Sequence, residues 1–463
     1  MQTYLFYDIE TTGLNKSFDQ ILQFAAIRTD QNLKELERYE LRVKLNPDCI
    51  PAPKALITHH IGVNAMREGI AEIDAIKQIH QWMNTPGTIS LGYNTLGFDD
   101  EFLRFSFYRN LLSPYTHQFA NQCQRMDLYP MCVMYYLFKN QLMNWPQKSG
   151  AVSLKLEELN RANQLATGRA HDAMVDVEAT LALANIFFKD QEMWKYLSSY
   201  FNKQMDQTRL NQLQNSEALM VDGIFGAEQN YQCVVFPLGT HKHYKNQTLW
   251  LRLDTENFRE INSDNIKELT RVKSKKAGEP DFILPFSERF NKHLQTEKKE
   301  LALANKKWLL EQPELLKKIT EFHADFLFPV FPHADADASL YLNGFWSFDE
   351  EKFCQRFHAV QPKEKIKLMD VVKNPRLKTI ATRILGRHYP EILTDSLREE
   401  FTNHLQKIHP EKEEQAMIDF RGEKRLTPNQ ALKEIKELRE TEKLSTEQLQ
   451  ILAEYEAHLQ SRT

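Results

Sequence analysis

Cysteine is scarce in this chain, and no two cysteines stand at the spacing of a metal-binding or redox pair. The sequence has five in 463 residues, scattered at Cys49, Cys123, Cys132, Cys233 and Cys354. An odd, unpaired set argues against a disulfide scaffold and against a cysteine zinc site. It is typical of reduced thiols in a cytosolic protein.

Long apolar stretches are also missing. No segment approaches the roughly 20 apolar residues that cross a bilayer, so we expect no contact with a membrane. The start, Met1-Gln2-Thr3, lacks the basic and apolar regions of a signal peptide, and we therefore expect a cytoplasmic location.

The chain has no excess of positive charge. Its formal net charge is −4 at pH 7, so any polyanionic partner requires a local basic groove. Hydrophobic residues make up 42% and charged residues 26%, which is typical of a soluble globular protein. The length is too great for a single core and predicts two or three domains.

Two acids stand out at the end of the first predicted strand. Asp8 and Glu10 lie in a segment that is otherwise aromatic and apolar, near residues 4–10. Residues two apart in a strand point to the same face, so the two carboxylates repel each other and resist burial. A bound divalent cation removes both costs. The strand end is therefore predicted to be half of a metal site.

Three downstream residues are candidates for the other half. Asp99 begins a predicted helix after a short apolar strand, and His171 and Asp176 stand four residues apart around the start of another helix. Oxygen ligands without cysteine suit Mg²⁺, with Mn²⁺ as a substitute, better than they suit zinc.

Taken in order, Asp-x-Glu, Asp and His-x4-Asp resemble the active-site set of the DEDDh group of 3′→5′ exonucleases. Within that group the chain is similar to the bacterial exonuclease I family. Asp-x-Glu alone occurs by chance in many chains, but the whole set in order is specific. The likeness extends to about residue 350, with a looser helical likeness beyond. Further similar segments are 23–30, 91–94, 107–110, 144–146, 170–174, 223–227 and 340–345.

The hydrophobic pattern predicts an α/β fold in the first part of the chain, with the second and third strands forming an antiparallel pair in a mixed five-stranded sheet. The resemblance implies a ribonuclease H-like exonuclease domain over 1–190, an SH3-like β domain over 200–345 and a C-terminal helical domain over 350–463. The predicted strands are 4–10, 22–29, 38–45, 88–93, 233–238 and 249–254. The predicted helices are 72–83, 99–109, 127–138, 154–162 and 172–188.

Phosphodiester cleavage suggests a role for each candidate residue. Two cations about 4 Å apart can activate a water and stabilise the leaving 3′ oxygen. Asp8, Glu10 and Asp176 are predicted to ligate them, Asp99 to hold the second ion, and Glu10 also to contact water and substrate. His171 is the predicted general base, because imidazole titrates near neutral pH.

The predicted path of the nucleic acid rests on basic and aromatic residues near these motifs. Single-strand channels combine phosphate contacts with aromatic stacking. A run of charge at 271–276 is interpreted as a solvated loop, and His59-His60 and His241/His243 lack acidic partners at ligand spacing, so we assign them no metal. The resemblance implies a basic contact at Lys155, and the other expected contacts are Arg104, Tyr115 and Phe119.

The resemblance implies metal-dependent, processive 3′→5′ digestion of single-stranded DNA to 5′-mononucleotides in DNA repair and recombination. It also implies a partner, the tail of single-stranded-DNA-binding protein, and we expect a monomer. Three alternatives stay open: an exoribonuclease, a polymerase-associated proofreader and a non-catalytic scaffold for single strands. The same acids serve exoribonucleases, because other side chains discriminate the 2′-OH.

Overall fold

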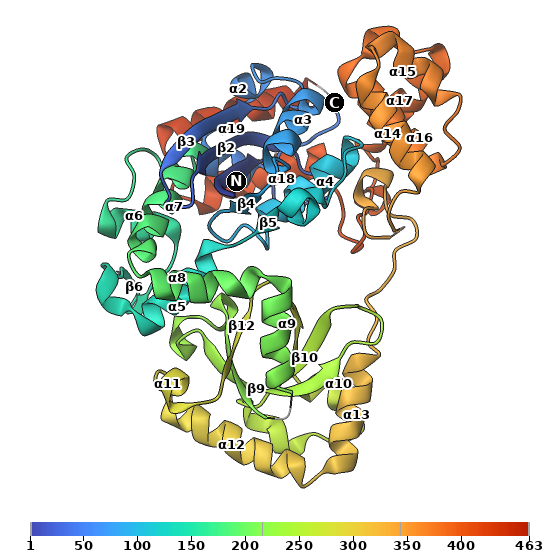
Figure 1. Ribbon diagram of the computed structural model, residues 1–463. Coiled ribbons are helices and arrows are strands. Elements are labelled where there is room, and N and C mark those ends of the chain that lie inside the picture. The colour runs from blue at the N-terminus through green and yellow to red at the C-terminus, as the bar shows by residue number, and fades with distance from the viewer. Residues whose placement is uncertain (1, 215, 343, 462–463) are drawn as a thin grey trace.

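The computed structural model describes residues 2–214, 216–342 and 344–461 (Figure 1). Met1, Asn343 of the segment 340–345, and the last two residues of the predicted C-terminal domain lie outside the described residues. Among the described residues, no helix is long and apolar enough to cross a bilayer.

The N-terminal part contains a mixed five-stranded sheet in the order β3-β2-β1-β4-β5, which confirms the predicted α/β class. The first strand lies in the middle, antiparallel to β2 and parallel to β4, and β2 pairs with β3 as predicted. Every residue of β2 is buried, whereas β3 forms an exposed edge. The strands are β1 (Thr3–Thr11), β2 (Ile21–Thr29), β3 (Glu35–Arg42), β4 (Thr88–Leu91) and β5 (Gln124–Arg125).

Helices cover this sheet, and two of them have the predicted bounds, 72–83 and 99–109. The sequence pattern did not reveal the two short helices α1 and α2, or the small sheet of β6 (Gln147–Lys148) and β7 (Ala151–Val152). The helices up to residue 212 are α1 (Pro53–His59), α2 (Val63–Arg67), α3 (Glu72–Met83), α4 (Asp99–Arg109), α5 (Leu128–Phe138), α6 (Leu156–Asn163), α7 (Ala173–Phe188), α8 (Gln191–Ser198) and α9 (Lys203–Gln212).

The middle part is a second five-stranded sheet in the order β11-β10-β9-β8-β12, drawn in green and yellow in the lower half of Figure 1. All its described pairings are antiparallel. The strands are β8 (Ala218–Val221), β9 (Gln232–Thr240), β10 (Gln247–Arg252), β11 (Val272–Lys276) and β12 (Phe282–Pro285). The helices are α10 (Ile266–Leu269), α11 (Glu288–Asn291), α12 (Thr296–Leu310) and α13 (Pro313–Ala324).

The interpretation of 271–276 as a solvated loop is wrong. Most of this run is strand β11, which pairs with β10. Lys275 is completely buried, and its ammonium group lies 2.7 Å from a carboxylate oxygen of Asp206 on α9. A long-range acidic partner therefore allows a lysine inside the second sheet.

The C-terminal part is helical, as predicted, but it divides into two groups in space (Figure 1). The first group packs beside α3 and α4, and its Arg387 contacts Asp48, in the segment between β3 and α1, at 2.6 Å. The second group packs on the N-terminal part through a shared core with α1. The first group is α14 (Phe348–Ala359), α15 (Pro362–Met369), α16 (Pro375–His388) and α17 (Asp395–Lys407), and the second is α18 (Pro428–Thr441) and α19 (Thr446–Gln460).

Local signals in the sequence account for the starts of these last two helices. Thr427 with Gln430, and Ser445 with Gln448, form the reciprocal capping contacts of a capping box. Leu452 and its neighbours on the apolar face of α19 are buried, but Leu449 in the first turn is 44% exposed. The three domain ranges 1–190, 200–345 and 350–463 remain a proposal, because α18 and α19 share a core with the first range.

Candidate active site

Strand β1 brings Asp8 and Glu10 to the edge of a large cavity. Asp8 pairs in register with Ala25 of β2, and the register shifts after Glu10, where the strand ends. Both acids are half-buried, and both line a cavity of about 980 Å³. The apolar side chains on either side of them, Tyr7 and Ile9, enter the core on the other face of the sheet.

Asp99 reaches the same cavity through the loop after β4. Parallel pairing sets Leu91 of β4 opposite Phe6 of β1, so the loop passes directly beside Asp8. A Cβ atom at Gly92 would lie 2.5 Å from the Tyr7 carbonyl oxygen, so only glycine permits this approach. Asp127 holds the loop by accepting hydrogen bonds from the backbone N–H of Asn94 (2.8 Å) and Leu96 (3.0 Å).

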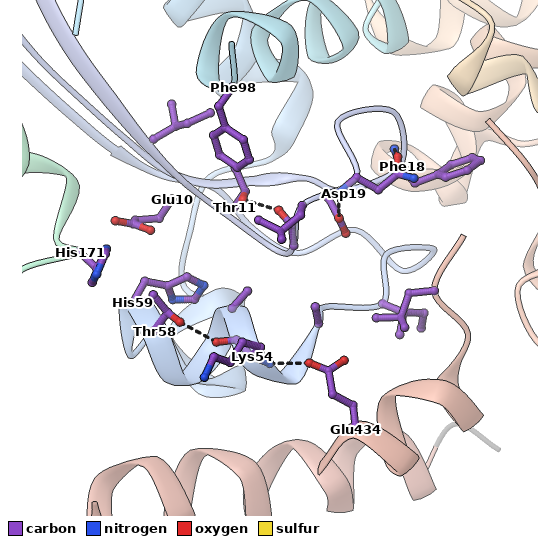
Figure 2. Close-up of a pocket in the computed structure, with 18 of the residues that line it drawn as sticks. Glu10, Thr11, Phe18, Asp19, Lys54, Thr58, His59, Phe98, His171 and Glu434 are labelled. Carbon is purple, nitrogen blue, oxygen red and sulfur yellow. Dashed lines mark hydrogen bonds between the residues drawn. The ribbon is translucent and has the colours of Figure 1, made fainter. Parts of the chain in front are cut away.

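His171 and Asp176 enter from the start of α7. Asp172 caps this helix by accepting a hydrogen bond from the Met174 N–H at 3.1 Å. His171 is exposed and has a left-handed backbone (φ 62°), and its N–H donates to Asp176 Oδ2 at 3.2 Å. Potential ligand atoms of Glu10, His171 and Asp176 all lie within 4.8 Å of one another. Figure 2 shows Glu10 and His171 beside each other at the cavity.

The structure therefore gathers all five predicted residues around one cavity: Asp8, Glu10, Asp99, His171 and Asp176. Burial, reinforced by the neighbouring carboxylates, raises the pKa of Glu10 to about 9. Burial likewise raises the pKa of Asp176 to about 6, and that of Asp8 well above its usual range. Such acids fit a divalent cation, because a bound cation removes their mutual repulsion.

These raised pKa values, caused first by burial and then by the neighbouring carboxylates, predict how the stability of the metal-free protein depends on pH. The folded-state pKa values of Glu10 and Asp176 lie above the values of about 4 in an unfolded chain. Their contribution to stability is therefore fully present below about pH 4 and is lost as the pH rises through 6 and 9. In EDTA, we expect the Tm to fall more steeply between pH 6 and 9 for the wild type than for Glu10→Gln.

Adding Mg²⁺ at pH 8 is expected to restore the Tm of the wild type more than that of Glu10→Gln, because the variant has lost one ligand. Differential scanning calorimetry measures both effects. Parallel Tm curves for the two proteins, with and without the cation, would contradict an acidic metal site.

The residues predicted to contact the nucleic-acid strand fall into two groups. Lys155 is exposed at the start of α6 and lines a second cavity of about 580 Å³, which shares His171 and Asp176 with the first. Tyr115 and Phe119 line a separate cavity of about 220 Å³ beside Phe345, and these two aromatic residues do not meet the acids.

Arg104 lies in an environment that opposes a role in binding phosphate. It is only 7% exposed and contacts Asp100 at 2.8 Å, and it also pairs with Glu101. Its charge is therefore already compensated inside the protein. Arg104 has a structural role here in place of the expected contact with DNA. Arg104 is held there by the buried carboxylate of Asp100. Burial alone would raise the pKa of Asp100, but the charges of Arg125 and Arg104 hold this pKa well below its usual range.

No sequence pattern predicted that the C-terminal helices contribute to the main cavity. Lys424, Lys433 and Glu434, from α18 and the segment before it, line this cavity, and Figure 2 shows Glu434 across the cavity from Glu10. The backbone N–H of Lys54 on α1 donates to Glu434 at 3.0 Å, which joins the two walls. These residues lie more than 350 positions from β1. The segment that contains them has only the charged residues that are usual on a helix surface.

Two protein families match the chain in order along the sequence. The family described as Exonuclease matches residues 5–184, and the family described as Exonuclease I C-terminal domain matches residues 334–462. Exodeoxyribonuclease I of Escherichia coli K12 is 29% identical over 427 residues, which cover 88% of this chain and 90% of that protein. Exodeoxyribonuclease I of Haemophilus influenzae is 30% identical over 57% of each chain.

The fold matches as well. The crystal structure of E. coli exonuclease I in complex with a dA16 oligonucleotide has a TM-score of 0.87 and 25% identity, and the match covers all of both chains. In sequence and in fold the chain is similar to the bacterial exonuclease I family. Another member of this family, the moderately thermophilic exonuclease I of Methylocaldum szegediense, matches with a TM-score of 0.84 over 100% of this chain and 99% of that one.

Proposed function

We infer that this protein is a 3′→5′ exonuclease that hydrolyses single-stranded DNA to 5′-mononucleotides. The observation that carries this conclusion is the convergence of Asp8, Glu10, Asp99, His171 and Asp176 on one cavity of a chain similar to the exonuclease I family. The E. coli relative was crystallised with single-stranded oligonucleotides, which supports the same substrate here. A role in DNA repair and recombination is proposed from the family.

Each residue of the site has a proposed task. Asp8, Glu10 and Asp176 would hold Mg²⁺, and Asp99 would hold a second ion, with Mn²⁺ as a substitute for either. Bound cations supply positive charge that acidifies a water and stabilises the leaving oxygen. His171, exposed on its loop beside Glu10, would accept the proton of the attacking water at a ring nitrogen.

The two cavities that meet at the acids suggest how the strand lies. The second cavity runs from His171 and Asp176 past Lys155 to Gly226 and Ala227 of the middle part, and we assign the body of the strand to it. The first cavity, which Glu10 lines, would hold the 3′-terminal nucleotide. Enclosure between the two parts would keep the enzyme on its strand and make it processive.

A salt titration tests this path. For single-stranded DNA, the logarithm of the binding constant K falls linearly with the logarithm of the salt concentration, with a slope of about −0.7 for each phosphate neutralised. We expect Lys155→Ala to make the slope shallower by about that amount and to weaken the binding of all DNA sequences to the same extent. The matched control is Lys148→Ala, which removes a nearby lysine already paired with Glu158 at 2.9 Å, and it should leave the slope unchanged.

The other predicted contacts give contrasting results in the same titration. Arg104→Ala should lower the Tm without changing the slope, because Asp100 and Glu101 already neutralise this guanidinium. Tyr115 and Phe119 line a separate cavity, so Tyr115→Ala and Phe119→Ala should weaken binding, with the slope unchanged, only if the strand also stacks on these rings. An unchanged slope in Lys155→Ala would mean that the strand follows another face.

Three further properties are proposed from the family. The tail of single-stranded-DNA-binding protein would bind as a partner, the protein would act as a monomer, and it would act in the cytoplasm. The five cysteines support the last proposal, since all are buried and free of disulfides.

Digestion of an end-labelled oligonucleotide tests the direction of attack. With a 5′ label and Mg²⁺, the products should shorten progressively from the 3′ end, and a 3′ label should appear first as a mononucleotide. A terminal phosphorothioate linkage at the 3′ end should slow digestion, whereas the same linkage at the 5′ end should not. Internal cuts at early times would contradict an exonuclease.

A further inference from the structure

The loop that carries His171 is irregular and lies beside the acids. It joins α6 to α7 over residues 164–172 and contains three residues with positive φ: Gln164 (53°), Gly168 (145°) and His171 (62°). Positive φ lies outside the right-handed helical region, so the helical hydrogen bonds of α6 end before the loop. Ala170 and His171 line the second cavity, so the position of the loop decides where the imidazole lies.

The middle of this loop is held by a contact from far along the chain. Arg169 donates two hydrogen bonds to the carboxylate of Glu447, from Nη1 at 2.9 Å and from Nη2 at 3.0 Å, across 278 positions of sequence. Paired bonds of this kind fix the direction of the guanidinium as well as its distance. Within the part of the chain that the structure describes, residues 167–170 make no other hydrogen bond or ion pair.

The helix that carries Glu447 is firmly attached to the N-terminal part. Glu447 lies in the first turn of α19, and Leu452 of the same helix is fully buried in the core shared with α1. The side chain of Gln448 donates to the Ile57 carbonyl of α1 at 2.9 Å. His60 of α1 also approaches Glu447, at 3.3 Å, but it does not belong to the loop. The carboxylate is therefore a fixed point to which the loop is tied.

The exposure of the pair limits what it can do. The side chain of Arg169 is 54% exposed and that of Glu447 is 50% exposed. An ion pair at this exposure adds little to the stability of a fold. It is large enough to shift the balance between two positions of a loop severalfold, because a loop with few other contacts has positions of similar free energy.

We propose that Glu447 is a positioning residue for the exonuclease reaction, because through Arg169 it holds the His171 loop where the imidazole reaches the attacking water. The imidazole has no strong tie of its own, since its Nε2 lies 4.0 Å from Glu157, beyond hydrogen-bonding distance. The C-terminal helices then do more than line the main cavity, since α19 sets the fraction of molecules in which the base is in place. This inference rests on the proposed function, in which His171 is the general base.

Single-turnover cleavage tests the proposal, because the rate constant for removing the 3′-terminal nucleotide, with enzyme in excess, does not depend on movement along the strand. The wild type would be compared with Arg169→Gln and Glu447→Gln, each of which breaks the pair and leaves His171 in the chain. The matched control is Glu456→Gln on the same helix, whose carboxylate pairs with Arg439 of α18 at 2.7 Å and not with the loop.

We expect the rate constant at saturating enzyme to fall about threefold to fivefold in both pair variants, the shift that an exposed ion pair can cause. The Tm, and the Kd for single-stranded DNA in EDTA, should stay unchanged, and Glu456→Gln should match the wild type. The double variant Arg169→Gln/Glu447→Gln should lose no more than either single variant, because each breaks the same pair.

A different result is expected if Arg169 itself binds DNA. In that case Arg169→Gln would raise the Kd for single-stranded DNA, and Glu447→Gln, which frees the guanidinium, would lower it. Either change in Kd would overturn the proposal.

The same substitutions in a His171→Ala background separate positioning from a general structural role. Because the pair acts through His171, Glu447→Gln should cause no further loss of rate once the imidazole is absent. An equal loss in both backgrounds, or pair variants indistinguishable from the wild type, would overturn the proposal. Failure of the proposed function is recognised separately, because the wild type would then digest no single-stranded DNA at all.

Discussion

Replacing Asp8 or Asp176 by asparagine is expected to abolish cleavage of single-stranded DNA and to leave DNA binding nearly intact. These carboxylates are predicted to bind cations and not bases, so the loss falls on the chemical step. Their raised pKa values show that burial and crowding oppose their charge in the metal-free site, which is the condition that a cation relieves. The rate with Mg²⁺ and the Kd in EDTA would be measured on one labelled oligonucleotide.

The matched control for this experiment is Glu178→Gln. Glu178 lies on the same helix as Asp176, two residues further, but its carboxylate pairs with Arg38. We expect this variant to cleave at the wild-type rate. Cleavage near the wild-type rate by Asp8→Asn or Asp176→Asn would remove these residues from the metal site.

His171→Ala is expected to lower kcat by about 10²- to 10⁴-fold, the usual contribution of a general base. The wild-type rate should fall as the pH drops below neutrality, because a charged imidazole cannot accept a proton. The variant should lose this part of the pH profile. Its residual rate would come from the acids and their cations, which the substitution leaves in place.

His60→Asn is the control, because it removes a nearby histidine that does not line the main cavity. It should keep both the rate and the pH profile. If His171→Ala showed the wild-type pH profile and only a small loss of rate, His171 would be a loop residue without a role in proton transfer.

The acids and the first sheet could be predicted because their signals are local. Asp8 and Glu10 stand two apart in an apolar strand, and a strand puts both on one face whatever the rest of the chain does. The bounds of α3 and α4 also follow from periodicity within a single segment.

The residues that were misjudged depend on partners far away in the sequence. Arg104 is a basic residue of the type that binds phosphate, but the fold buries it beside Tyr341 of the C-terminal part. Lys275 belongs to a basic run, but Asp206 draws it into the second sheet.

Digestion of matched substrates tests the central claim most directly. Single-stranded DNA, duplex DNA and single-stranded RNA of one sequence would be incubated with the wild type and Mg²⁺, and the release of mononucleotides would be followed over time. The account predicts rapid release from single-stranded DNA and little from the duplex or the RNA. Faster digestion of the RNA would indicate an exoribonuclease, and binding of single-stranded DNA without digestion would indicate a scaffold; either result would contradict the account.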